Sequence, residues 1–209
     1  MSTVLLTGFE PFADAAVNPS AEAVHLAADL WDGPETLVTD VLPVTFAGAA
    51  SRLRELIATH SPDIVIASGL AGGRAAIGIE RVAVNLIDAR IPDNDGAQPV
   101  DEPSIPGAPA AHFSSLPVKA IAHAVAAAGI PVEVSHSAGT FVCNHAMFVA
   151  LHEAARRPGM RAGFVHVPWA DGGGEPSLPL ETLVQALLLT VRTALDTPTD
   201  AALPGGTLH

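Results

Sequence analysis

Apolar residues of this 209-residue chain follow two alternating patterns, short continuous runs and longer stretches with a period near 3.6. The continuous runs predict buried strands over 4–9, 36–44, 63–70, 81–88, 132–138 and 161–168. The periodic stretches predict helices over 18–31, 46–60, 115–129, 144–157 and 179–195. Strands buried on both faces are typical of parallel sheets, and their alternation with helices indicates an α/β fold. We therefore predict a single three-layer α/β/α domain with a mostly parallel twisted sheet.

Two segments lie outside this alternation. Residues 89–110 contain five prolines and several acidic residues, and a connection of that length is usually functional. We expect this segment to act as a lid or a subunit contact. Residues 197–209 are rich in Thr, Pro and Gly and predict a flexible C-terminal tail, which leaves residues 1–196 as the domain.

Charge and composition exclude several classes of protein. The chain has 10 Lys+Arg against 22 Asp+Glu, a net charge of −12 and no basic run, so we expect no nucleic-acid partner. No stretch approaches the roughly 18 apolar residues of a membrane span, and the N-terminal residues show neither the charged n-region nor the apolar run expected of a signal peptide. We therefore expect a cytoplasmic protein that does not bind membranes. A single cysteine excludes an internal disulfide and a Cys-rich zinc module.

That cysteine, Cys143, is the first candidate for chemistry. A turn of small residues over 138–140 precedes it and a predicted helix follows, so its sulfur should lie near a helix N-terminus. Backbone N–H groups there favour a thiolate and can hold an oxyanion. Two alternatives stay open. Cys143 is an inert core thiol, or it shares a metal with His145 and His152, although C-x-H with one Cys is not a zinc spacing.

A thiol nucleophile needs a base, and His166 is the candidate because it ends the predicted strand over 161–168. Sites of α/β proteins lie at such strand ends. A strand histidine held by a backbone carbonyl is the alternative. Glu80 could orient the imidazole, or it could pair with Arg74 or Arg81. The glycines near Arg74 match neither common nucleotide-binding pattern.

Four stretches together resemble the pyroglutamyl peptidase type I family. They are TGFEPF followed by NPS, ERVAVNLIDARIPDNDGAQP, SHSAGTFVCNH and RAGFVHVPW, in the family's order and spacing. The resemblance extends to about Leu195. It implies a cysteine peptidase that removes an N-terminal pyroglutamyl residue from peptides without a metal or organic cofactor. It also implies a homo-oligomer, a tetramer or a dimer.

The resemblance implies roles for particular residues. Cys143 would be the nucleophile that forms a thioester, His166 its base, Glu80 the carboxylate that orients the base, and Arg90 a group near the oxyanion. The resemblance implies a pocket for the pyroglutamyl ring lined by Phe9, Phe12, Asn18, Thr45, Ile91, Phe141 and Val142.

The chain departs from the family pattern at four positions. Ala13-Asp14 stands where Gly-Gly is frequent, Leu70 where some members carry Gln, and His136 where Asn is frequent. Two other classes of function remain as alternatives. One is a non-peptidase enzyme on a similar scaffold, such as a nucleoside phosphorylase, and the other is a binding module in which Cys143 only fills the core.

Overall fold

The computed structural model describes residues 1–13 and 15–206. A six-stranded sheet with the order β2-β1-β3-β8-β4-β7 forms its centre. The first four strands are parallel, and the last two run the opposite way because β4 pairs antiparallel with β8 and parallel with β7. The bounds are β1 Thr3–Phe9, β2 Thr36–Leu42, β3 Ile64–Leu70, β4 Ile77–Glu80, β7 Val132–Ser135 and β8 Arg161–Val167.

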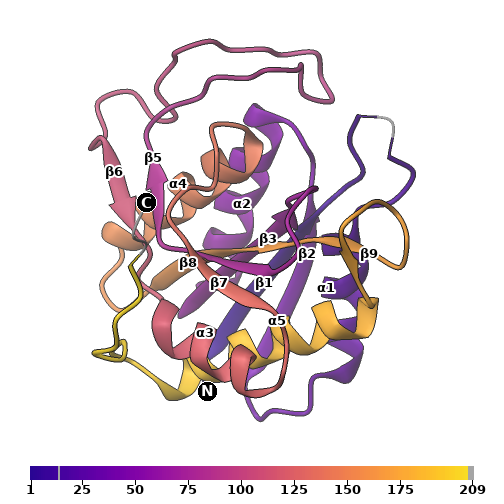
Figure 1. Ribbon diagram of the computed structural model, residues 1–209. Coiled ribbons are helices and arrows are strands. Elements are labelled where there is room, and N and C mark those ends of the chain that lie inside the picture. The colour runs from indigo at the N-terminus through magenta and orange to yellow at the C-terminus, as the bar shows by residue number, and fades with distance from the viewer. Residues whose placement is uncertain (14, 207–209) are drawn as a thin grey trace.

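Helices cover both faces of this sheet (Figure 1). Helices α2 and α4 lie on one face, and α1, α3 and α5 lie on the other. The bounds are α1 Pro19–Leu30, α2 Phe46–His60, α3 Val118–Ala127, α4 Val142–Ala155 and α5 Leu180–Asp196. The predicted fold class, three α/β/α layers around a mostly parallel sheet, is confirmed.

Local sequence signals explain where the helices begin. The Asn18 side chain accepts a hydrogen bond from the Ser20 N–H, and Pro19 occupies the first helical position of α1. Thr45 caps α2 in the same way through the Gly48 N–H. Helix α4 has no such side-chain cap and begins at Val142, two residues before the predicted start. This earlier start places Cys143 inside the first turn.

The predicted strand over 81–88 is shorter than expected and lies outside the main sheet. The chain leaves the main sheet after Glu80, and β5 (Val82–Val84) pairs with β6 (Ala111–Phe113) in a separate ribbon. The buried side chain of Asn144 on α4 holds this segment, because it bonds both the N–H (3.0 Å) and the C=O (2.9 Å) of Val84. A second short ribbon joins β9 (Trp169–Ala170) and β10 (Ser177–Leu178).

The long connection between β5 and β6, at the top of Figure 1, contains the predicted 89–110 loop. The buried carboxylate of Asp93 anchors it, because it accepts hydrogen bonds from the N–H groups of Phe46, Asp95 and Ala97. The first of these bonds ties the loop to the start of α2. The predicted role of the segment as a lid or subunit contact stays a prediction.

The segment after α5 contacts α3. Helix α3 follows Pro117, which offers no side-chain cap, and Asp200 accepts hydrogen bonds from the N–H groups of Lys119 (3.1 Å) and Ala120 (3.0 Å) instead. The predicted flexible tail therefore begins with a segment bonded to the domain, and its last residues, 207–209, lie outside the described residues. No helix within the described part of the chain is long and apolar enough to span a membrane.

The two faces of the sheet differ in composition. The face under α2 and α4 buries Phe9, Phe46, Phe148 and Phe164, with Phe12 and Phe141 packed against them. Six of the seven phenylalanines of the chain therefore lie on this face. The opposite core consists of Ala, Val, Leu and Ile.

Candidate active site

His166 lies between two glycines of the neighbouring strands. It is the penultimate residue of β8, and the register places Gly69 of β3 on one side and Gly78 of β4 on the other. A Cβ atom at Gly69 would lie 2.8 Å from the Cys143 sulfur, and one at Gly78 would lie 2.6 Å from Nη1 of Arg74. Each missing side chain thus leaves space that a functional group from another segment occupies.

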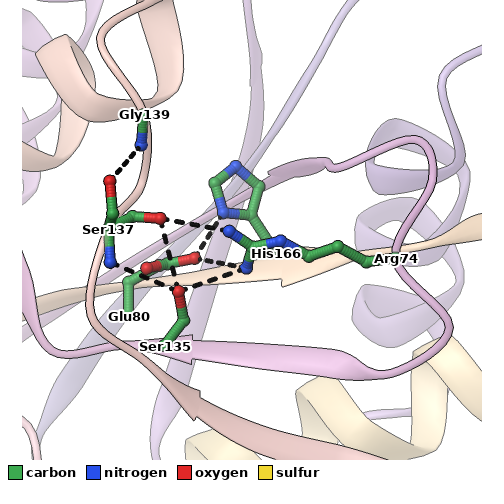
Figure 2. Close-up of polar contacts among 6 residues, drawn as sticks. All are labelled: Arg74, Glu80, Ser135, Ser137, Gly139 and His166. Carbon is green, nitrogen blue, oxygen red and sulfur yellow. Dashed lines mark hydrogen bonds and ion pairs between the residues drawn. The ribbon is translucent and has the colours of Figure 1, made fainter. Parts of the chain in front are cut away.

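Glu80 contacts two of the three partners that the sequence left open, His166 and Arg74. Its Oε1 atom lies 2.7 Å from Nδ1 of His166 and 2.8 Å from Nη1 of Arg74 (Figure 2). Glu80 and Gly78 are two residues apart on β4 and face the same side of the sheet. Because Gly78 has no side chain, the imidazole and the guanidinium both reach the carboxylate.

The surroundings of Glu80 keep it ionised. Its side chain is fully buried, and burial on its own would raise the pKa of the carboxyl. The hydrogen bond from His166, the charge of that imidazole and the charge of Arg74 outweigh burial, so the pKa lies below its usual value. A negative charge is therefore available to stabilise an imidazolium.

Cys143 is the second residue of α4 and is half-buried, which confirms the predicted helix-start position. Burial and the negative charge of Glu80 raise the pKa of the thiol to about 12, and Arg74 opposes them only in part. Burial therefore opposes the effect that the helix start was expected to have on this thiol. The described residues include no hydrogen bond between the thiol and His166, although both line one cavity. The resting thiol is neutral until a base removes its proton.

The cavity beside Cys143 and His166 is small, about 160 Å³, compared with roughly 300–1,000 Å³ for sites that hold drug-sized ligands. Five residues predicted for the pocket line it: Phe9, Phe12, Asn18, Phe141 and Val142. Its other walls are Val44, Leu70 and Ala138. The wall is therefore mainly apolar, and Leu70, a departure from the family pattern, is part of it. Asp14, another departure, lies outside the described residues.

The structure does not bring three predicted site residues to the cavity wall. Thr45 is buried and uses its hydroxyl to cap α2. Ile91 is 42% exposed and Arg90 is exposed, both in the long connection before β6. Sequence reasoning did not assign Val44 or Ala138 to the pocket, although Val44 precedes the predicted pocket residue Thr45 and Ala138 lies within the SHSAGTFVCNH stretch. The predicted role of Arg90 near the oxyanion stays a prediction.

The alternative metal site is not assembled. His145 pairs with Ser104 at 2.5 Å, and His152 lies 3.4 Å from Nε2 of His112. Among the described residues, no group of three or more His, Cys, Asp or Glu side chains could hold a metal ion. Cys143, His145 and His152 therefore have separate environments.

Cysteine hydrolases need a thiol that a neighbouring base can deprotonate and a group that holds the base in place. Here Glu80 contacts His166, and Cys143 lines the same cavity as His166 on an α/β/α scaffold. The protein is a cysteine hydrolase. A family model described as pyroglutamyl peptidase matches residues 2–197, and the chain belongs to this family.

Known relatives and solved structures agree with this assignment. The chain is 48% identical to a pyrrolidone-carboxylate peptidase of Clavibacter michiganensis and 49% identical to one of Cupriavidus taiwanensis, with all of each chain covered. The crystal structure of pyroglutamyl peptidase I from Bacillus amyloliquefaciens matches with a TM-score of 0.92 at 43% identity, covering 97% of this chain and 99% of that one. The pyrrolidone carboxyl peptidase of Thermococcus litoralis matches at 0.89 and 40%, covering 94% of each chain.

Proposed function

We propose that the protein hydrolyses the bond after an N-terminal pyroglutamyl residue of a peptide, with Cys143 as nucleophile, His166 as base and Glu80 as orienting carboxylate. One observation carries this assignment, the 2.7 Å contact of Glu80 with Nδ1 of His166 beside the cavity that contains Cys143. The family names of the relatives support the substrate class.

In the first half of the reaction, His166 takes the proton of the Cys143 thiol. Glu80 holds Nδ1, so Nε2 is the nitrogen that receives the proton, and the carboxylate stabilises the resulting imidazolium. The sulfur attacks the pyroglutamyl carbonyl carbon, and the carbonyl oxygen becomes an oxyanion. Backbone N–H groups at the start of α4 would stabilise the negative charge of this oxyanion by hydrogen bonds, with help from Arg90. The C–N bond then breaks as His166 gives its proton to the leaving amine.

The second half hydrolyses the thioester. His166, neutral again, takes a proton from a water molecule whose oxygen attacks the same carbonyl carbon. The C–S bond breaks, and the thiolate recovers its proton from His166. Pyroglutamate leaves, and the thiol is restored.

The apolar cavity explains selection of a lactam. A pyroglutamyl residue has no charged α-amine, whereas an N-terminal Gln would bring an ammonium group that loses its hydration at a cost of several kcal/mol. The polar wall residue Asn18 does not offset this cost, because Glu10 O, Ser20 N and Ser20 Oγ already engage its amide. Phe9, Phe12 and Phe141 would pack against the ring.

A chromogenic pyroglutamyl amide tests the proposal. The wild-type protein should release the chromophore and leave the corresponding prolyl amide intact, and Cys143→Ser should lose activity by about a thousandfold or more. Equal rates for wild type and Cys143→Ser would refute the thiol mechanism. Activity that requires phosphate and survives thiol alkylation would favour a phosphorylase instead.

We also expect the enzyme to act in the cytoplasm as a homo-oligomer, a tetramer or a dimer, with peptides as its partners. The 89–110 segment would then contact a neighbouring subunit or cover the cavity. Limited proteolysis distinguishes these roles, because a covering segment should be cleaved more slowly with an inhibitor bound. Equal cleavage with and without the inhibitor would argue against a lid.

A further inference from the structure

Arg74 has no role in the proposed reaction, yet its guanidinium contacts the orienting carboxylate of Glu80. It lies in the turn between β3 and β4, and its guanidinium passes over Gly78. The turn brings it beside the carboxylate of Glu80, with the His166 ring on that same carboxylate (Figure 2).

The guanidinium bonds two separate parts of the site. Its Nη1 donates to Oε1 of Glu80 at 2.8 Å and to Oγ of Ser135 at 3.3 Å, and its Nη2 donates to the carbonyl of Ser137 at 3.1 Å. The two serines belong to the segment that leaves β7 and enters α4, where Cys143 lies. One side chain therefore joins the orienting carboxylate to the backbone that leads to the nucleophile.

This connecting segment is itself ordered by short polar contacts. Ser135 Oγ donates to the carbonyl of Ser137 at 3.3 Å, and Ser137 Oγ accepts from the N–H of Gly139 at 3.2 Å (Figure 2). Because Nη2 of Arg74 donates to the same Ser137 carbonyl, a shift of the guanidinium would disturb both ends of the chain of contacts. Arg74 is part of this network and is not an isolated surface ion pair.

The charge of Arg74 acts on the same groups. This charge is one of the causes that lower the pKa of Glu80. Burial and the charge of Glu80 raise the pKa of Cys143, and the charge of Arg74 offsets part of that rise. Within the described residues, the ionisable side chains that contact Glu80 are His166 and Arg74, and of these Arg74 carries the permanent charge. Removal of the guanidinium would leave a fully buried carboxylate without its permanently charged partner.

We infer that Arg74 is a positioning residue of the proposed peptidase. It fixes Glu80 for His166, and it aligns the 135–141 segment that leads into α4 and so places Cys143 relative to the base. This inference rests on the proposed function. Arg74 is not among the residues that line the cavity in which the pyroglutamyl ring would bind. Its loss should therefore affect turnover and leave substrate binding nearly unchanged.

Arg74→Met tests the role, with Arg74→Lys and Arg81→Met beside it. Arg74→Met should lower kcat by about 30-fold or more and change KM by less than about twofold. The limb of the pH profile of kcat/KM that reports Cys143 should move to higher pH by about half a unit, because loss of a positive charge favours the protonated thiol. A residue with only a structural role would lower the rate equally at every pH.

Arg74→Lys keeps the charge but loses the planar fork that spans Glu80 and Ser137. It should keep the wild-type pH limbs and lower kcat by about tenfold. Arg81→Met removes the same charge from the adjoining position, where the described side chains form no ion pair with it. It should behave like wild type in both respects.

Three results would overturn the inference. They are an Arg74→Met enzyme with unmoved pH limbs, a rise of KM that accounts for the loss, and an equal pH shift in Arg81→Met. If Arg74→Met does not fold, full turnover by Arg74→Lys would overturn it instead. The proposed function fails separately, because then the wild-type protein itself leaves the pyroglutamyl amide intact or Cys143→Ser retains activity.

Discussion

The two faces of the central sheet bury different kinds of side chain, and this difference separates stability from chemistry. The face under α1, α3 and α5 is filled by aliphatic side chains such as Ile66, Ile79 and Val165. The face under α2 and α4 buries rings and charges together. Its buried titratable groups among the described residues are Glu80, Asp93, His145 and His166. One face can therefore supply stability with few geometric demands, while the other must hold fixed charges in place.

Neighbouring residues on β4 give the sharpest test of this division, because Glu80 and Ile79 point to opposite faces. Glu80→Gln should lower kcat by about a hundredfold or more, since a neutral amide cannot stabilise the imidazolium, and should perturb folding much less. Ile79→Ala should cost about 2–5 kcal/mol of unfolding free energy and leave the kcat of the folded enzyme intact. Steady-state kinetics and urea unfolding measure the two effects. Unchanged turnover in Glu80→Gln would end its assigned role.

The pH dependence of stability should come from the polar face. Burial, and then the charge of Arg54, lower the pKa of His145 to about 4. An unfolded histidine titrates near 6.5, so between about pH 6.5 and pH 4 the unfolded chain binds a proton that the folded chain does not. The free energy of unfolding should therefore decrease as the pH is lowered from about 6.5 to about 4, by up to about 3 kcal/mol.

His145→Gln removes the titrating group while keeping an acceptor for Ser104, which lies 2.5 Å from the ring nitrogen. Urea unfolding between pH 4 and pH 7 should show a shallower slope for this variant than for wild type. His60→Gln, at the exposed end of α2, is the matched control and should keep the wild-type slope. Parallel slopes for wild type and His145→Gln would contradict the assignment to His145.

Two strand glycines extend the comparison. Gly69→Ala would place a Cβ atom 2.8 Å from the Cys143 sulfur, and Gly163→Ala would place one 2.6 Å from Cδ1 of Leu116 on the other face. Both variants should lose about 1–3 kcal/mol of stability through overpacking. Only Gly69→Ala should also lower kcat/KM of the folded enzyme, by about tenfold, because the thiol must move. Similar kinetics for the two variants would show that the site tolerates displacement of the sulfur.

The smallest effect concerns the aliphatic side. Asp200→Ala removes the side-chain acceptor for the first turn of α3 and should cost about 1 kcal/mol of stability. Thermal unfolding measures the loss, and turnover should stay at the wild-type value. An unchanged melting temperature would show that the Asp200 contacts contribute nothing to the fold.

Periodicity alone predicted all five helices and most strands of the main sheet, because a strand buried on both faces and an amphipathic helix differ clearly in pattern. It failed where the same letters suit two structures. The apolar residues over 82–84 fit a central strand, yet Asn144 and β6 satisfy their backbone groups outside the main sheet. The short β4, with Gly78 at its centre, gave too weak a pattern to be identified.

The candidate site shows a similar limit. Motifs pointed to Glu80, Cys143 and His166. Cys143 and His166 line the cavity, and Glu80 contacts His166. Sequence could not decide whether Glu80 meets His166 or Arg74, since both contacts depend on strand register and on the space over Gly78. It also could not show how deeply the thiol is buried, because a helix start is a local feature while burial depends on the whole core.

The glycines on either side of His166 set the tolerance of this enzyme to mutation. Neither supplies an atom to the chemistry, yet the sulfur stands where one side chain would be and the guanidinium where the other would be. A complete substitution scan should therefore find both positions sensitive to substitution, although less sensitive than the reacting residues. More positions are therefore restricted in sequence than contact the substrate. The additional positions are recognised by the absence of a side chain.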